Sequence, residues 1–144
     1  MRVLTIAFLT LAIAVSAYSQ TRLKVGEPAP AFTGVTLDGT DFDLNQLRGS
    51  VVVITFWSTR CEICHVEFPK LNRLIKAYNG KKIVFLSLTN ENEEKIEAYI
   101  KKNPLETQIL PNSFGVLLQY ADRDKNGNLD MGYPSYYVVN DAGN

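Results

Sequence analysis

The stretch from Val51 to Pro69, VVVITFWSTRCEICHVEFP, constrains this chain most, because it joins a buried strand to two cysteines and then to a helix. Residues 51 to 56 form a continuous β-branched and aromatic run, which is typical of a central strand covered on both faces. The apolar positions after the first cysteine are spaced by four, three, four and three, at Cys64, Phe68, Leu71, Ile75 and Tyr78. That spacing predicts a helix with one buried face.

The two cysteines form a Cys-x-x-Cys pair at the expected start of this helix. Cys61 would lie among unpaired backbone N–H groups at the positive end of the helix dipole, which favours a thiolate over a thiol. Cys64 would lie one turn into the helix, near enough to attack a mixed disulfide on Cys61 and release the partner in reduced form. The pattern predicts Cys61 as the nucleophile and Cys64 as the resolving thiol.

The composition fits one small globular domain with an adequate core, because 46% of the 144 residues are hydrophobic. This excludes a disordered or fibrous chain. The 15 basic and 15 acidic residues balance, so charge gives no reason to expect nucleic acid as a partner. A closed zinc site needs four ligands, and two cysteines and one histidine are too few. We expect no metal and no cofactor.

Residues 1–19 have the pattern of a secretory signal peptide, with a basic start, a short apolar core and small residues at Ala17 and Ser19. The apolar run is nearer about 15 than the roughly 20 residues that a membrane span needs. We therefore expect cleavage after Ser19, or after Ala17 as the second choice, with no stable membrane insertion afterwards. The mature protein would be periplasmic or otherwise extracytoplasmic.

Export affects the interpretation of the cysteines, because disulfides persist outside the cytoplasm. Cys61 and Cys64 are the only two cysteines, so they can pair only with each other or with a partner molecule. A disulfide that closes so short a loop constrains the unfolded chain very little. A purely structural role would therefore contribute little stability, which favours a redox role.

The remaining chain alternates between predicted strands and helices. The first of these elements is an N-terminal hairpin that turns at Asp38-Gly39. We then expect a buried strand within 81–90, a helix capped by Asn90 or Asn92, an edge strand over 106–110, a helix over 113–121, a polar loop over 122–132 and a strand near 136–139. This last strand is followed by a turn without a second strand, which leaves an edge unpaired. We therefore expect that a C-terminal strand and helix are missing.

These parts together resemble the TlpA/ResA-like thioredoxin family, whose members are exported thiol–disulfide oxidoreductases. The resemblance covers residues 25–144. It rests on Gly26-x-x-Ala29-Pro30-x-Phe32, Leu37-Asp38-Gly39, Leu47-Arg48-Gly49, Phe56-Trp57 before the cysteines, Glu67-Phe68-Pro69, and Gly132-Tyr133-Pro134-Ser135. It implies an α/β, thioredoxin-like three-layer fold with an N-terminal β-hairpin.

The resemblance also implies roles for four residues. Cys61 would attack and Cys64 would resolve, while Pro134 would carry a cis peptide bond packed against the dithiol and shape a groove for the substrate backbone. Glu67 matches an acidic residue that influences thiol ionisation in the family, and a solvated helix charge is an equal alternative. The implied partners are thiols or disulfides of exported proteins and a membrane thiol–disulfide reductant.

Two positions depart from the family pattern, because Arg60 and Ile63 replace the usual tryptophan and proline. The charge of Arg60 favours the Cys61 thiolate, whereas the charge of Glu62 opposes it. Strong oxidants rely on greater thiolate stabilisation than this mixed pair provides. We therefore expect a reducing or isomerising enzyme.

Two alternatives concern the same motif. Cys61-x-x-Cys64-His65 is also the c-type haem attachment pattern, for which Met131 would be the candidate distal ligand. The buried strand before the motif and the Phe68-Pro69 pair after it fit the thioredoxin interpretation better. A second alternative is a thioredoxin-like substrate-binding module whose dithiol turns over little.

Two further alternatives concern other segments. A peroxiredoxin would share the Gly26 to Phe32 segment, but the Thr-x-x-Cys motif is absent, since Ser58 has that spacing to Cys61. The stretch from Asp122 to Gly127 copies the opening of an EF-hand calcium loop, yet the twelfth position would be Tyr133 rather than a bidentate glutamate. A polar surface insertion explains that segment better.

Overall fold

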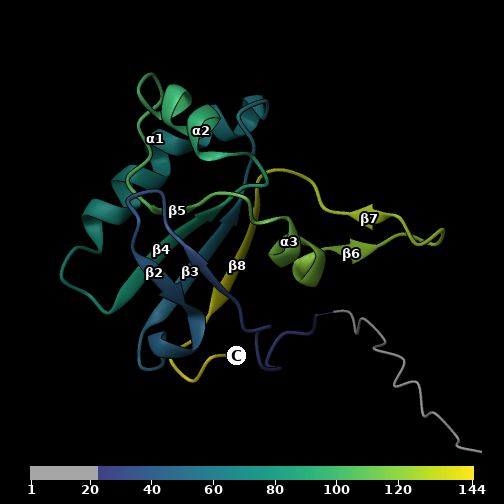
Figure 1. Cartoon of the computed structure of the whole chain (residues 1–144). Helices are drawn as coiled ribbons and strands as arrows, with labels where there is room; N and C mark the ends of the chain where they lie inside the picture. The colour runs from purple at the N-terminus through teal and green to yellow at the C-terminus, as the bar shows by residue number, and fades with distance from the viewer. Residues whose placement is uncertain (1–22) are drawn as a thin grey trace, which may run out of the picture.

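The computed structural model describes residues 23–144 and places a four-stranded sheet at the centre (Figure 1). The strand order is β5-β4-β3-β8, and the strands are β3 (Val51–Phe56), β4 (Ile83–Leu88), β5 (Gln108–Leu110) and β8 (Ser135–Val139). β3, β4 and β5 are parallel, whereas β8 runs antiparallel to β3. The predicted signal peptide, residues 1–19, lies outside the described residues.

Smaller elements surround this sheet. The helices are α1 (Glu62–Ala77), α2 (Glu93–Ile100), α3 (Phe114–Tyr120) and the 3-10 helix η1 (Leu44–Leu47). The two short hairpins are β1 (Thr33–Val35) with β2 (Asp41–Asp43), and β6 (Asp122–Arg123) with β7 (Leu129–Asp130). The mixed helices and strands confirm the predicted α/β fold with an N-terminal hairpin. Within residues 23–144, no helix has the length and apolar character that crossing a membrane requires.

The alternation of side chains along the central strands builds two apolar layers, one on each face of the sheet. Val52, Ile54 and Phe56 of β3 pack in the layer that includes the β1–β2 hairpin and α3. Trp57, directly after β3, packs in the layer under α1 and α2. Figure 1 shows α1 and α2 close together, away from α3. The uninterrupted apolar run in β3 is therefore explained by burial on both faces.

Local signals in the sequence position the turns and caps of this fold. Asn92, rather than Asn90, caps α2, and its side-chain oxygen accepts a hydrogen bond from Lys95 N at 3.1 Å. Gly39 has φ +84°, a conformation that glycine adopts without strain, and the turn between β1 and β2 is formed there. Both predictions are confirmed in type and position.

The segment from 122 to 132 differs from the predicted polar loop, because it forms the β6–β7 hairpin that projects from the body in Figure 1. Asp124 organises its turn: Oδ1 accepts bonds from Asn126 N at 2.8 Å and Asn128 N at 2.9 Å. Two-residue strands carry too little apolar periodicity to be recognised. The Asp124 carboxylate is used within this turn, and residues 23–144 contain no group of three or more His, Cys, Asp or Glu side chains that could hold a metal ion.

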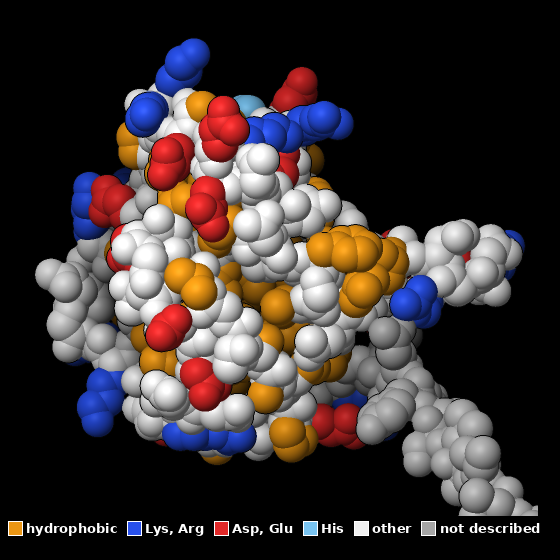
Figure 2. Space-filling model, viewed as in Figure 1, with side chains coloured by type: hydrophobic (Ala, Val, Ile, Leu, Met, Phe, Trp, Pro, Cys, Tyr) orange, Lys and Arg blue, Asp and Glu red, His pale blue; other side chains and the backbone are white. Residues whose placement is uncertain are grey.

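The outer edge of β8 is unpaired within residues 23–144. After the strand, Asn140 N donates to Asn144 O at 2.9 Å, which closes a turn at the end of β8. The expected final strand and helix stay a prediction. Figure 2 shows basic and acidic side chains dispersed over the visible face, which agrees with the balanced charge.

Truncating Leu86 tests the central position of β4. Its side chain is 0% exposed, so Leu86→Ala leaves a cavity, and we expect it to lower the free energy of unfolding by about 2–5 kcal/mol. Leu74→Ala, at a position on α1 that is 44% exposed, should cost under about 1 kcal/mol. Urea unfolding measures both, and equal losses would contradict this core assignment.

Candidate active site

The two cysteines lie where the loop after β3 leads into the first turn of α1. Their sulfur atoms are bonded to each other. Cys61 is the N-cap residue of α1, and its Sγ accepts a hydrogen bond from Cys64 N at 3.1 Å. This Sγ is a disulfide sulfur and stands in for the thiolate that reduction would leave on Cys61. The free N–H groups and dipole of the helix N-terminus favour a negative charge at that atom.

The two sulfur-bearing residues differ in their access to solvent. Cys64 is 0% exposed, whereas Cys61 is only partly buried. A shallow surface depression beside Cys61 is lined by Ser58, Arg60, Glu62, Ile63 and Tyr133. A second molecule can therefore approach Cys61 but not Cys64.

A cluster of three aromatic side chains packs on the buried side of the dithiol. Trp57 is 0% exposed and packs edge-on to Phe68, with ring centroids 5.1 Å apart. Tyr99 of α2 packs against both rings, at 5.5 Å from Trp57 and 6.3 Å from Phe68. Cys64 belongs to the same buried cluster. The first two turns of α1 are thus held on the sheet by large, rigid side chains.

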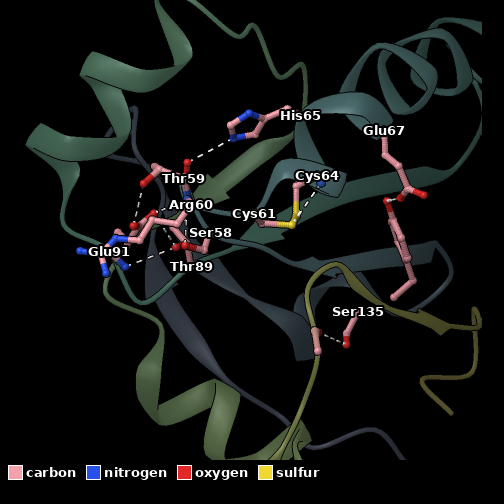
Figure 3. The surroundings of a disulfide bond; sticks show 12 residues. Ser58, Thr59, Arg60, Cys61, Cys64, His65, Glu67, Thr89, Glu91 and Ser135 are labelled. Carbon is pink, nitrogen blue, oxygen red and sulfur yellow. Dashed lines mark hydrogen bonds between the residues drawn. A yellow bond between two sulfur atoms is a disulfide. The ribbon is translucent and has the colours of Figure 1, made fainter.

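The loop before Cys61 is held by Glu91, a residue that the sequence analysis did not single out. The Glu91 carboxylate accepts hydrogen bonds from Thr59 N at 2.7 Å and from Thr59 Oγ1 at 2.8 Å. It also forms an ion pair with Lys95, and its own side chain is 9% exposed. Figure 3 shows Glu91 beneath the Ser58–Arg60 segment. The contact spans 32 positions, so no local pattern indicates it.

Opposing effects act on the charge of Glu91. Burial raises the pKa of its carboxyl, but the hydrogen bonds from Lys95 and Thr59 outweigh burial and lower that pKa below its ordinary value of 4.5. The carboxylate is therefore ionised at neutral pH. Burial raises the pKa of Tyr133 beside the dithiol, and the charge of Glu91 raises it further.

His65 is oriented by the same loop. Its Nε2 lies 3.2 Å from Thr59 O, and because a carbonyl oxygen only accepts hydrogen bonds, Nε2 carries the hydrogen in this contact. The ring also packs against Tyr99 at 5.0 Å. In this disulfide form the motif Cys61-x-x-Cys64-His65 is engaged in other contacts, so the structure gives the haem alternative no support.

Glu67 has a hydrogen-bond partner on β8, and its influence on thiol ionisation stays a prediction. It lies in the second turn of α1, is partly buried, and its Oε2 accepts a hydrogen bond from Tyr136 OH at 2.7 Å. Tyr136 is the second residue of β8. Figure 3 shows Glu67 one turn beyond Cys64, on the side facing this strand.

The segment before β8 contains a cis peptide bond between Tyr133 and Pro134. Ser135 Oγ donates to Gly132 O at 2.6 Å, which closes a tight turn around the bond. Tyr133 lines the depression beside Cys61, so this loop borders the dithiol. The structure therefore brings the four predicted site residues, Cys61, Cys64, Glu67 and Pro134, into one region formed by α1 and the start of β8.

The model of the AhpC/TSA family matches residues 25–144, which is most of the chain. The chain belongs to the AhpC/TSA family. One curated relative is thioredoxin-like protein YneN of Bacillus subtilis, which is 29% identical to this chain over 124 residues. The match covers 84% of the chain and 68% of YneN. Thiol-disulfide oxidoreductase ResA of Bacillus cereus is 29% identical over 89 residues, covering 61% of the chain and 51% of ResA.

Solved structures of thioredoxin-family proteins are similar to this chain in fold. The thioredoxin domain of thiol-disulfide oxidoreductase BVU-2223 from Bacteroides vulgatus superposes with a TM-score of 0.71 at 25% identity, covering 84% of each chain. A thiol:disulfide interchange protein of the thioredoxin family from Chlorobium tepidum gives a TM-score of 0.69 at 25% identity, covering 81% of this chain and 80% of that one.

These comparisons confirm the resemblance to ResA-like proteins and the thioredoxin-like fold. They also confirm the prediction of a thiol–disulfide oxidoreductase with the Cys61–Cys64 pair as its redox dithiol. The peroxiredoxin alternative still lacks its Thr-x-x-Cys motif in this chain.

Replacing Glu91 tests the hydrogen bonds between its carboxylate and Thr59, in the loop before Cys61. Because folding lowers the pKa of Glu91, its stabilisation is fully present above pH 4.5 and is lost as pH falls below that value toward the folded-state pKa. At pH 7, Glu91→Gln should lower the free energy of unfolding by about 1–3 kcal/mol, and the difference from the parent should shrink at pH 3.

Glu97→Gln is the matched control, because Glu97 lies exposed on α2. Urea unfolding at the two pH values measures all three proteins. A Glu91→Gln difference that stays constant with pH, or that equals the control, would contradict the role of this carboxylate.

Proposed function

We propose that this chain reduces or exchanges disulfides in exported proteins, with Cys61 as the attacking thiol and Cys64 as the resolving thiol. The observation that carries the proposal is the unequal exposure of the bonded pair, since Cys64 is 0% exposed while Cys61 borders the surface depression. Only Cys61 can react with a protein substrate. Cys64 can react only within the protein, by attacking the sulfur of Cys61.

The reaction has two steps. The reduced Cys61 thiolate attacks one sulfur of a substrate disulfide, and the other substrate sulfur leaves with the electron pair of the broken bond. The Cys64 thiol then loses its proton and attacks Cys61 Sγ, which releases the second substrate sulfur. Two electrons pass to the substrate, and the enzyme is left as the Cys61–Cys64 disulfide seen here.

Glu67 and Pro134 are assigned supporting roles in this scheme. Glu67 lies three residues after Cys64 on α1, a spacing that makes the two side chains neighbours on the helix surface. Its carboxylate would receive the Cys64 proton in the second step. The loop at Pro134, next to the depression, would support the substrate backbone while Cys61 reacts.

The proposed location is extracytoplasmic, after removal of residues 1–19. The signal-like sequence supports this, together with a cysteine pair that closes too short a loop to be mainly structural. A reductase working outside the cytoplasm needs a supply of electrons. We assign that supply to a membrane thiol–disulfide reductant that returns the Cys61–Cys64 pair to the dithiol.

Trapping experiments distinguish the two cysteines. Cys64→Ser keeps the attacking thiol but removes the resolving one, so incubation with a disulfide-bonded model protein should accumulate a Cys61-linked mixed disulfide. Non-reducing electrophoresis and peptide mass spectrometry identify the linkage. Cys61→Ser is the matched control and should trap nothing, because Cys64 is buried.

Two results would contradict this proposal. Trapping through Cys64 in the Cys61→Ser variant would reverse the assigned roles. No trapping in either variant, with the parent unable to reduce the same protein, would favour the binding-module alternative.

A further inference from the structure

The hydrogen bond between Tyr136 and Glu67 joins the active helix to the strand that follows the cis peptide bond. Tyr136 OH donates to Glu67 Oε2 at 2.7 Å, and the two residues are 69 positions apart in the sequence. A hydrogen bond to an ionised carboxylate is roughly twice as strong as one between neutral groups. Tyrosine has few rotatable bonds, so little side-chain entropy is lost in making it. The contact therefore restricts where the Glu67 carboxylate can point.

The position of that carboxylate matters because Cys64 has no direct access to water. Its side chain is 0% exposed, so a proton leaving its thiol needs an acceptor supplied by the protein. Glu67 is one turn away on the same helix, at the spacing that makes side chains neighbours. Proton transfer requires the acceptor to be within hydrogen-bond reach, directly or through one water. A freely rotating glutamate would sample several rotamers, whereas the bond to Tyr136 fixes one position of the carboxylate, one helical turn from Cys64.

We propose that Tyr136 is a positioning residue for the resolving step, in which its hydroxyl holds the Glu67 carboxylate for proton transfer from Cys64. This inference rests on the proposed function. In the step, the proton passes from Cys64 Sγ to Glu67, a bond forms between the sulfurs of Cys64 and Cys61, and the substrate sulfur leaves with the electron pair of its broken bond. Tyr136 itself touches none of the reacting sulfur atoms.

The chemical state of Tyr136 suits this role. Burial raises the pKa of its phenol well above the ordinary value of 10.0, and the hydrogen bond and charge of Glu67 raise it further. The hydroxyl therefore keeps its proton and remains a donor at neutral pH. Tyr136 is 45% exposed, so replacing it with phenylalanine removes the donor without opening a cavity.

The next residue of β8 provides a matched control. Tyr137 points to the opposite face of the sheet, as adjacent strand residues do, and packs against the other apolar layer. Its hydroxyl donates to Tyr120 O at 2.8 Å and makes no contact with Glu67. Tyr137→Phe thus removes the same atom from the same strand while leaving the Tyr136–Glu67 bond intact.

The test separates the two chemical steps in a single turnover. Reduced protein is mixed with a disulfide-bonded peptide, quenched with acid at successive times, and analysed by mass spectrometry for mixed disulfide and for oxidised enzyme. Tyr136→Phe should slow resolution of the mixed disulfide about fivefold and leave its formation unchanged. Tyr137→Phe should change neither rate.

A double-mutant comparison shows whether Tyr136 acts through Glu67. Glu67→Gln should slow resolution about tenfold or more, and adding Tyr136→Phe to it should have no further effect. Melting temperatures of all variants establish that each protein is folded. An additive double variant, or an equal slowing of both steps by Tyr136→Phe, would overturn the inference.

The remaining outcomes distinguish this inference from the function on which it rests. If Glu67→Gln slows resolution and Tyr136→Phe does not, the positioning role fails while the proton-acceptor role stands. If neither variant slows resolution, both roles fail. If the parent forms no mixed disulfide at all, the proposed function itself fails.

Discussion

The capping of α1 by Cys61 is the interaction on which the site depends. The strand β3 is buried on both faces and ends at Phe56, so the chain must leave the sheet there. Five residues later Cys61 caps the helix, and Cys64 N donates to its Sγ at 3.1 Å. One contact therefore begins the helix, supplies hydrogen bonding to the reactive sulfur and places the second sulfur within bonding distance.

Two contacts distant in sequence hold this junction in place. On one side, Glu91 binds both donors of Thr59 and fixes the loop that precedes Cys61. On the other, Tyr136 binds Glu67 and ties the helix to β8. The apolar cluster around Trp57 packs beneath them. The polar contacts orient the loop and the helix, and the apolar contacts hold them on the sheet. As a result, Cys61 Sγ faces outward and Cys64 stays buried.

Much of this architecture could be predicted from the sequence, for reasons that are local. The continuous apolar run of β3, the helical spacing after Cys64 and the Asp38-Gly39 turn each reflect a short-range rule, and the structure contains all three. The cysteine pair could be recognised because its function requires a fixed spacing within one turn of helix.

The missed features depend on contacts between distant segments. Glu91 looks like an ordinary acid before a helix, and only the folded chain places it under Thr59. Tyr136 looks like one more apolar strand residue, since nothing in the sequence pairs it with Glu67. The β6–β7 hairpin was missed because hydrogen bonds to Asp124, not apolar alternation, define its turn.

The equilibrium reduction potential of the Cys61–Cys64 pair tests the central claim most directly. Thiol buffers of graded potential would set the redox state of the pair. Trp57 fluorescence would report that state, because Trp57 lies in the same buried cluster as Cys64. Alkylation of free thiols would give the number of reduced cysteines at each potential. The account predicts a reversible two-electron transition in the folded protein at or below about −220 mV. A midpoint near about −120 mV would mark a disulfide donor and contradict the reducing direction. The absence of any reversible transition would contradict the enzymatic role altogether.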